Sequence, residues 1–407
     1  MSVNALQRAL HVGFGSASVT PPARIAAAIV ILDRVLAGAA AERALTGWAR
    51  ASRFAGSGDR AAVRDLVFTA LRRRRSAGWI GGADTGRGLM IGLARAQGQD
   101  TGALFTGQSH APAPLLADEG QGDLTAAPPA VRLDQPDWLW PLLGDSLGDG
   151  RDRVCAVLQQ RAPVMLRVNL RKGDRAGAIA ALAIAGIAAR PHPDIRTALE
   201  VTYNAPKIKL SSPYLTGLVE LQDAASQAAM LRLPLSDGLR VLDYCAGGGG
   251  KALAMAALAQ VDVTAHDAAP ARMADLPARA ARAGVVVRQC RHDGLAGLGP
   301  FDLVLVDAPC SGSGSWRRAP EARWRLTPAA LDALCATQAR ILDQAGPLVA
   351  PGGVLAYATC SVLTAENDAQ VAAFLSRRSD WGQLARDRFL PDALQDGFFI
   401  AQLRRSG

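Results

Sequence analysis

Two of the six cysteines end apolar, strand-like segments and begin loops of small polar residues. Cys310 follows the segment 302–306 in the run Asp307-Ala308-Pro309-Cys310-Ser311, and Cys360 follows the segment 353–358. Ligands bind at the carboxyl edge of a parallel sheet, so both thiols are expected to face one cleft. A thiolate that adds to carbon 6 of a pyrimidine makes carbon 5 able to take a methyl group. Spacing alone does not decide which cysteine attacks.

The same chemistry gives roles to neighbouring groups. Asp307 directly precedes the Cys310 loop and is placed to stabilise the charge that develops near ring nitrogen 3. After methyl transfer, a base must remove the proton from carbon 5 so that the attacking thiol can leave. A second cysteine or a water molecule is able to serve that step.

A glycine-rich turn predicts the cofactor site. The apolar segment 240–244 runs into a turn and then a helix, and glycines there let the backbone approach a ligand at the helix N-terminus. The turn consists of Cys245, Ala246, Gly247, Gly248, Gly249, Gly250 and Lys251. Asp267 ends the next strand, where a carboxylate accepts bonds from ribose hydroxyls, and Asp293 ends a third, near the expected adenine. Asp293 is alternatively a helix cap or turn residue. The absence of GxGxxG and of a P-loop ending favours S-adenosylmethionine over a nicotinamide cofactor.

The other cysteines predict no chemistry. Cys155, Cys290 and Cys335 are expected to be buried small hydrophobes. Since there is no CxxC pair and no clustered histidine, neither a metal site nor a disulfide scaffold is expected, and reduced thiols indicate a cytoplasmic protein. Residues 1–15 lack the apolar run of a signal peptide. The longest apolar run, 176–189, is shorter than the roughly 20 residues that span a bilayer.

The chain must supply a scaffold for these groups. Apolar residues at helical spacing predict an all-helical domain over 1–107, and a proline-rich stretch predicts a linker over 108–136. Mixed helix and strand signals over 137–235 predict a small α+β module. From 236 to 407, short apolar strands alternate with alanine-rich helices, which predicts an α/β domain with a doubly wound parallel sheet.

The basic composition favours a polyanionic partner. The net charge is +9, and most of the excess is arginine, although a coding bias toward arginine explains this equally well. The run Arg72–Arg75 is either a solvated helix end or a phosphate contact. Other candidate RNA contacts lie in the middle module and after Cys310, with Trp316 and Trp324 either stacked on bases or packed in the core. The basic candidates are Arg161, Arg167, Arg171, Lys172, Lys207, Lys209, Arg317, Arg318, Arg323 and Arg325.

These motifs resemble a known family. The runs VLDYCAGGGGK, FDLVLVDAPCSGSG and GVLAYATCSVLTAEN, with RRAPEARWRLTP and QDAASQ, are similar to those of the RsmB/NOP (Sun) family of RNA cytosine-5 methyltransferases. The resemblance covers about 137–405. The helical region resembles, more loosely, the NusB-like domain of the branch that methylates bacterial 16S ribosomal RNA.

The resemblance implies a Rossmann-like catalytic domain, S-adenosylmethionine as cofactor and RNA as partner, without a membrane. It assigns the attack to Cys360 and product release to Cys310. It places the glycine turn, Asp267, Asp293 and Asp307 on the cofactor, with Lys251 and Asp307 also near the target base. A monomer acting on 16S ribosomal RNA, naked or in an early assembly particle, is expected.

One position departs from the family and leaves alternatives open. Gly248 stands where the family usually has proline, which would stiffen the turn. Transfer RNA is an alternative substrate. Methylation of DNA or of an exocyclic amine is another, although the amine route typically uses an Asn/Asp-Pro-Pro-aromatic loop that is absent here. The non-enzymatic alternative is an RNA-binding assembly factor with weak or no activity.

Overall fold

The computed structural model describes residues 19–407, so the segment 1–15, where no signal peptide is expected, lies outside the described residues. The chain divides into two compact units, with the boundary between Pro136 and Asp137. No helix within residues 19–407 is long and apolar enough to cross a membrane. Each unit is described by itself below.

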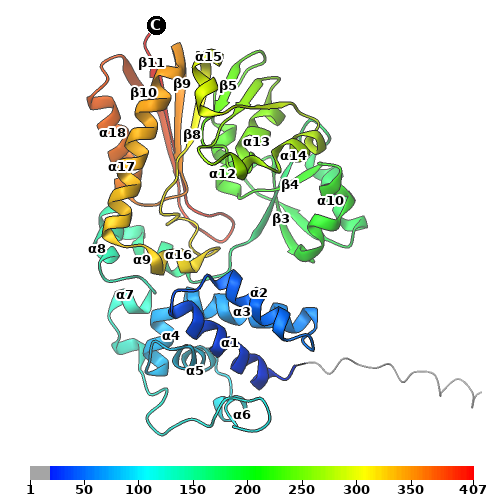
Figure 1. The fold of residues 1–407 in the computed structure, drawn as a ribbon, viewed down its shortest axis with the longest axis vertical. Coiled ribbons are helices and arrows are strands. Elements are labelled where there is room, and N and C mark those ends of the chain that lie inside the picture. The colour runs from blue at the N-terminus through cyan, green and yellow to red at the C-terminus, as the bar shows by residue number, and fades with distance from the viewer. Residues whose placement is uncertain (1–18) are drawn as a thin grey trace, which may run out of the picture. The chain divides into compact units, whose positions relative to one another are not determined.

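The regular elements within residues 19–136 of the first unit are all helices, as predicted for the range up to 107 (Figure 1). Helix α1 begins after Thr20, whose hydroxyl accepts a hydrogen bond from the backbone of Ala23, and proline occupies its first position. Its apolar stripe is buried against α3 and α5 and forms the core of the unit. The helices are α1 (Pro21–Leu36), α2 (Ala41–Ala51), α3 (Ser57–Arg72), α4 (Arg74–Gly81), α5 (Gly86–Ala96), α6 (Thr101–Leu104), η2 (Leu124–Ala126) and α7 (Pro129–Arg132).

The segment 108–136, expected to be a linker, instead belongs to the compact first unit. The buried carboxylate of Asp134 accepts hydrogen bonds from the backbone and hydroxyl of Ser76, both at 2.8 Å. Glu119 pairs with Arg87 at 2.7 Å. Proline and glycine content predicted the lack of regular structure, but side chains far apart in sequence hold the segment in place.

The second unit begins with a four-stranded antiparallel sheet in the order β2-β3-β1-β4. Helices α10 and α11 pack against it around Leu166, Leu182 and Leu199. This is the predicted α+β module. Its elements and the flanking helices are α8 (Leu139–Leu147), η3 (Gly148–Gly150), α9 (Arg151–Leu158), β1 (Val164–Val168), α10 (Arg175–Ile184), β2 (Ala188–Pro191), β3 (Ala198–Tyr203), η4 (Ala205–Leu210), α11 (Ser212–Leu215), β4 (Val219–Leu221) and α12 (Ala224–Leu231).

The rest of the unit is built on a seven-stranded sheet in the order β10-β11-β9-β8-β5-β6-β7. Its strands are β5 (Arg240–Asp243), β6 (Asp262–Ala265), β7 (Val287–Gln289), β8 (Phe301–Asp307), β9 (Val349–Thr359), β10 (Trp381–Phe389) and β11 (Phe398–Arg405). Its helices are α13 (Gly250–Leu258), η5 (Pro270–Met273), α14 (Leu276–Ala283), η6 (His292–Gly294), α15 (Leu295–Leu298), α16 (Pro320–Arg325), α17 (Pro328–Ala345), η7 (Gly346–Leu348), η8 (Thr364–Glu366) and α18 (Asp368–Ser376).

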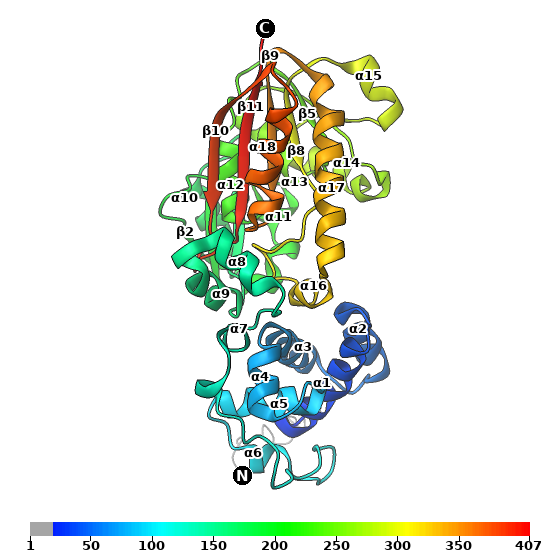
Figure 2. The ribbon, with the colours of Figure 1, turned by 90° about the vertical axis from the view of Figure 1, so that its left-hand side faces the viewer.

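The five neighbouring strands β7, β6, β5, β8 and β9 run parallel, which confirms the predicted doubly wound core. Successive side chains along a strand point to opposite faces of the sheet. Leu355 and Tyr357 of β9 pack under α17 and α18, whereas Ala356 and Ala358 pack under α12 and α13 (Figures 1 and 2). The hairpin β10–β11, which runs antiparallel beside β9, was not predicted. Its outer strand is rich in charged and polar residues, as edge strands often are, and so lacks a clear apolar pattern.

Candidate active site

A cavity of about 1070 Å³ lies at the carboxyl ends of β5, β6, β8 and β9. The parallel register brings Asp243 level with Leu305, and Asp307 level with Ala358, so the following loops meet at one edge. Most predicted site residues line this cavity: Cys245, Ala246, Gly247, Gly248, Gly250, Lys251, Asp267, Asp307, Cys310 and Cys360.

Two predicted residues do not line the cavity. Gly249 is the N-cap of α13 with a φ of +77°, and a Cβ there would lie 2.2 Å from Leu276. Glycine is therefore required by conformation and by packing at this position. Asp293 lies exposed on η6.

The glycine turn is held by the acid after β6. Asp267 is buried, and its carboxylate accepts hydrogen bonds from the backbone of Gly247 at 2.8 Å and of Ala269 at 2.9 Å. Arg272 lies 3.3 Å from the same carboxylate. The guanidinium of Arg279, which also lines the cavity, donates to the carbonyl of Gly248. The turn is thus fixed from two sides although it lacks the usual proline.

Asp243, at the end of β5, lines the cavity and was not among the predicted site residues. One carboxylate oxygen accepts a hydrogen bond from the backbone of Ala252 at 3.0 Å. The other is buried and has no partner among the described residues. Burial raises the pKa of Asp243 to about 7. The sequence did offer a signal, because Asp243 is an acid that follows two apolar residues at the last position of its strand.

The two cysteines lie together inside the cavity. The sulfur of Cys310 is 3.5 Å from the sulfur of Cys360, close enough for one thiol to donate to the other. The hydrogen bond from Cys310 lowers the pKa of Cys360. The same interaction, together with burial, raises the pKa of Cys310. The lowered pKa of Cys360 and the raised pKa of Cys310 favour Cys360 as the thiolate and Cys310 as the thiol that donates to it.

Lys251 and Asp307 form an ion pair beside the thiols, with the ammonium nitrogen 2.6 Å from the carboxylate. Burial opposes the charged amine, but Asp307 raises the pKa of Lys251, so the amine stays protonated. The ammonium also lies 5.2 Å from the centre of the Phe398 ring. Phe398 begins β11, so the unpredicted hairpin contributes to the site, as do Asp396 and Gly397 before it.

Several residues considered as RNA contacts are part of the protein interior. Trp316 is buried, and its indole donates to the carbonyl of Ser311 at 3.0 Å. Arg317 and Arg323 are also buried. Arg167 is buried and donates to Gln222 and to the carbonyl of Gly250. Long amphipathic side chains pack as readily as they bind phosphate, and sequence does not separate the two uses. Lys207 and Lys209 remain exposed on η4.

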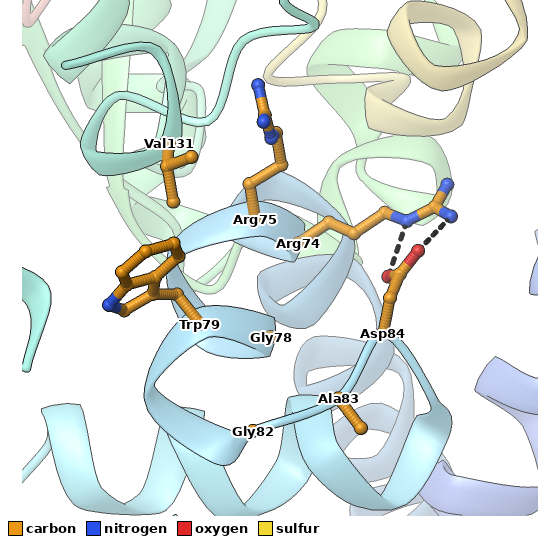
Figure 3. A pocket seen from close by; sticks show the side chains of 8 residues that line it. All are labelled: Arg74, Arg75, Gly78, Trp79, Gly82, Ala83, Asp84 and Val131. Carbon is orange, nitrogen blue, oxygen red and sulfur yellow. Dashed lines mark hydrogen bonds and ion pairs between the residues drawn. The ribbon is translucent and has the colours of Figure 1, made fainter. Parts of the chain in front are cut away.

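The arginine run of the first unit is also engaged within the protein (Figure 3). Arg72 is buried. Arg74 pairs with Asp84 through two hydrogen bonds of 2.9 and 2.5 Å, and Arg75 donates to the carbonyl of Gln135 at 2.6 Å. These two side chains and Trp79 border a shallow pocket of about 410 Å³. Its polar groups are thus turned toward the protein's own acceptors.

Of the remaining cysteines, Cys155 is buried as predicted, whereas Cys290 and Cys335 are only partly buried. The Cys335 sulfur contacts the carbonyl of Ala365, and the Cys290 sulfur that of Arg291. None of the three lines the cavity. Cys310 and Cys360 are therefore distinguished from the other three by their position at the sheet edge rather than by exposure.

A parallel sheet with a glycine turn after its first strand and an acid after its second defines a Rossmann-like methyltransferase domain. Sequence comparison then identifies the family. The pattern of the 16S rRNA methyltransferase RsmB/F family matches residues 230–404, and that of the RsmF/B-like ferredoxin-like domain matches residues 135–206. The chain belongs to the RsmB/F methyltransferase family, which confirms the resemblance seen in its motifs.

The relatives support this assignment. The chain is 35% identical over 287 residues to ribosomal RNA small subunit methyltransferase B of Salmonella arizonae and of Salmonella typhi, with 67% of each chain covered. Among solved structures, PH0851 matches with a TM-score of 0.73 at 22% identity, covering 95% of this chain and 99% of that one. NSun6 from Pyrococcus horikoshii with SFG matches with a TM-score of 0.59 at 18% identity, covering 67% and 98%. These two likenesses concern the fold.

Proposed function

We propose that this chain transfers a methyl group from S-adenosylmethionine to carbon 5 of a cytosine in small-subunit ribosomal RNA. The observation that carries the proposal is the pair of thiols 3.5 Å apart beside the Lys251–Asp307 ion pair. Methylation of an exocyclic amine needs no thiol, and a degenerate assembly factor has no need to keep all four groups in one cavity. The curated relatives named ribosomal RNA small subunit methyltransferase B support ribosomal RNA as substrate.

The cavity offers a donor and acceptor set that fits the cofactor. The unpartnered carboxylate oxygen of Asp243 is suited to the amino group of the methionine part. Asp267 lies at the end of β6, where the ribose of a nucleoside cofactor is expected, and the glycine turn allows close approach of the backbone. When bound, the cofactor supplies an electrophilic methyl group.

The residues then divide the reaction between them. The Cys360 thiolate adds to carbon 6 of the cytosine, which places an electron pair on carbon 5 for the incoming methyl group. Asp307, held by Lys251, lies near ring nitrogen 3 and, in its protonated form, donates a hydrogen bond that stabilises the negative charge of the adduct. Cys310 gives its own proton to solvent and then, as a thiolate, takes the proton from carbon 5. The electrons of that bond restore the ring double bond and expel Cys360 as a thiolate.

Two cysteine variants test the proposal on RNA with a labelled methyl donor. Cys360→Ala is expected to abolish transfer, whereas Cys310→Ala is expected to accumulate a covalent protein–RNA adduct because release fails. Cys290→Ala, outside the cavity, serves as the control and should keep full activity. If Cys310→Ala alone is inactive and Cys360→Ala retains activity, the two roles are reversed. If the intact protein methylates no RNA, the assembly-factor alternative holds.

The substrate class is tested separately. Bisulfite mapping of ribosomal and transfer RNA from a deletion strain should show one lost 5-methylcytosine in 16S ribosomal RNA. Loss confined to transfer RNA would replace the proposed substrate and leave the chemistry unchanged.

A further inference from the structure

Glu366 is a fully buried carboxylate beneath the two cysteines, and the reaction described above does not use it. Its exposed fraction is 0%, it does not line the cavity, and it forms no ion pair within residues 19–407. A buried carboxylate without a cation is costly unless hydrogen bonds replace the lost water. The hydrogen-bond donors around Glu366 therefore indicate its role.

The hydrogen bonds to Glu366 come from both cysteine loops. The backbone amide of Ser311 donates to one carboxylate oxygen at 2.7 Å, and its hydroxyl donates to the other oxygen. The hydroxyl of Ser361 donates at 2.6 Å. Ser311 directly follows Cys310 and Ser361 directly follows Cys360, so one carboxylate joins two loops that are fifty positions apart in sequence.

A third arm reaches the first loop from α17. The amide of Gln338 donates to the Glu366 carboxylate at 3.1 Å and to the carbonyl of Pro309 at 3.0 Å. Glu366 is itself held from β9, because the hydroxyl of Tyr357 donates to its backbone carbonyl at 2.7 Å. The carboxylate thus has a fixed position relative to the sheet, and the loops take their position from it.

We propose that Glu366 is a positioning residue for this reaction: its buried carboxylate clamps the Cys310 and Cys360 loops together. The proposal rests on the proposed function for the roles of the cysteines. The clamp fixes the separation of the two sulfurs. The negative charge of Glu366 favours the thiol form of Cys310, because a second anion nearby disfavours a thiolate.

The charges around the pair agree with this division. After the hydrogen bond to Cys360 and burial, the carboxylate of Glu366 is among the causes that raise the pKa of Cys310. Tyr357 also interacts with Cys310. Asp307 and Lys251 act on Cys360 instead, where Asp307 raises the pKa and Lys251 lowers it. Glu366 is therefore a source of negative charge on the Cys310 side of the pair that takes no part in the chemistry.

Two substitutions separate the clamp from the charge. Glu366→Gln removes the charge and turns an amide group toward the serine donors, whereas Glu366→Asp keeps the charge but withdraws it from both loops. We expect kcat to fall about 10- to 100-fold in both, as for loss of charged hydrogen bonds, with KM for the cofactor changed less than about twofold. Asp343→Asn, at an exposed site on the same helix as Gln338, is the control and should match the parent.

A measurement without methyl transfer makes the test independent of the proposed function. In a Cys360→Ala chain, the rate of Cys310 alkylation by iodoacetamide is followed against pH, because only the thiolate reacts. Adding Glu366→Gln should shift this profile to lower pH, and adding Glu366→Asp should leave it nearer its original position. A profile that Glu366→Gln does not move, or a kcat that it does not lower, overturns the proposal.

If a Glu366 variant does not fold, removing the serine hydroxyls that donate to its carboxylate tests the clamp instead. Ser311→Ala and Ser361→Ala each remove one hydroxyl donor and leave the charge in place. Both should lower kcat, and the double variant should lower it further, with the Cys310 alkylation profile retained. Unchanged kcat in the double variant contradicts the clamp.

Discussion

Asp396→Ala should destabilise the second unit strongly, because it removes a carboxylate that pairs with a buried cation. Arg317 is 1% exposed, and its guanidinium contacts the Asp396 carboxylate at 2.5 Å. Removing one partner of a buried ion pair costs about 3–5 kcal/mol. Arg317 keeps hydrogen bonds to the carbonyls of Asp392 and Gln395, so the lower end, about 3 kcal/mol, is expected. Arg318 also loses a partner, but it remains partly in solvent and adds little.

Thermal unfolding measures this effect. For a unit of this size, about 3 kcal/mol corresponds to roughly 6–12 °C in Tm. The control is Asp387→Ala, which breaks the exposed pair with Arg232 and should cost less than about 1 kcal/mol. Adding Arg317→Met to Asp396→Ala should recover part of the loss, because the unpaired charge is gone. An Asp396→Ala variant as stable as the control, or no recovery in the double variant, would refute the reasoning.

Three further predictions concern the site. The hydrogen bond from Cys310 lowers the pKa of Cys360, so Cys310→Ala should raise the Cys360 pKa and move the pH dependence of Cys360 alkylation to higher pH. An unchanged alkylation profile would show that Cys310 does not have this role. Asp267→Asn should weaken cofactor binding about tenfold in calorimetry, while Asp262→Asn at the opposite end of β6 should not; equal effects would place the cofactor elsewhere. Arg279→Ala frees the Gly248 carbonyl in the glycine turn and should weaken cofactor binding about two- to tenfold. Adding Gly248→Pro should restore part of the affinity, because proline stiffens the turn. Unchanged or still weaker binding in the double variant would contradict the view that Arg279 replaces the stiffness of proline.

The positions of the two cysteines were predictable because they follow from strand ends. A parallel sheet places all carboxyl ends at one edge, so recognising β8 and β9 is enough to bring Cys310 and Cys360 to the same cavity. The same reasoning located Asp267. It failed to bring Asp293 into the cavity, because β7 is only three residues long and its following turn lies exposed.

The contributions that were missed depend on contacts that no local pattern encodes. Glu366 lies in the motif that follows Cys360, but nothing in the sequence pairs it with Ser311. Phe398 reaches the cavity because β11 inserts beside β9, which is a matter of strand order rather than of strand recognition. Trp316 and Arg317 lie in a basic, aromatic stretch of the kind that binds RNA, yet tertiary packing buries both.

The distance between the two cysteines along the chain has a consequence for biosynthesis. Their sulfurs meet only after β8, α17 and β9 have assembled, since fifty positions separate them. Contacts this far apart in sequence form after local ones, because a long loop must close first. Until then Cys360 has no thiol donor and keeps the weak reactivity of an ordinary cysteine. A newly made chain is thus spared premature alkylation or oxidation at its most reactive atom, and thiol reactivity becomes a late marker of correct folding.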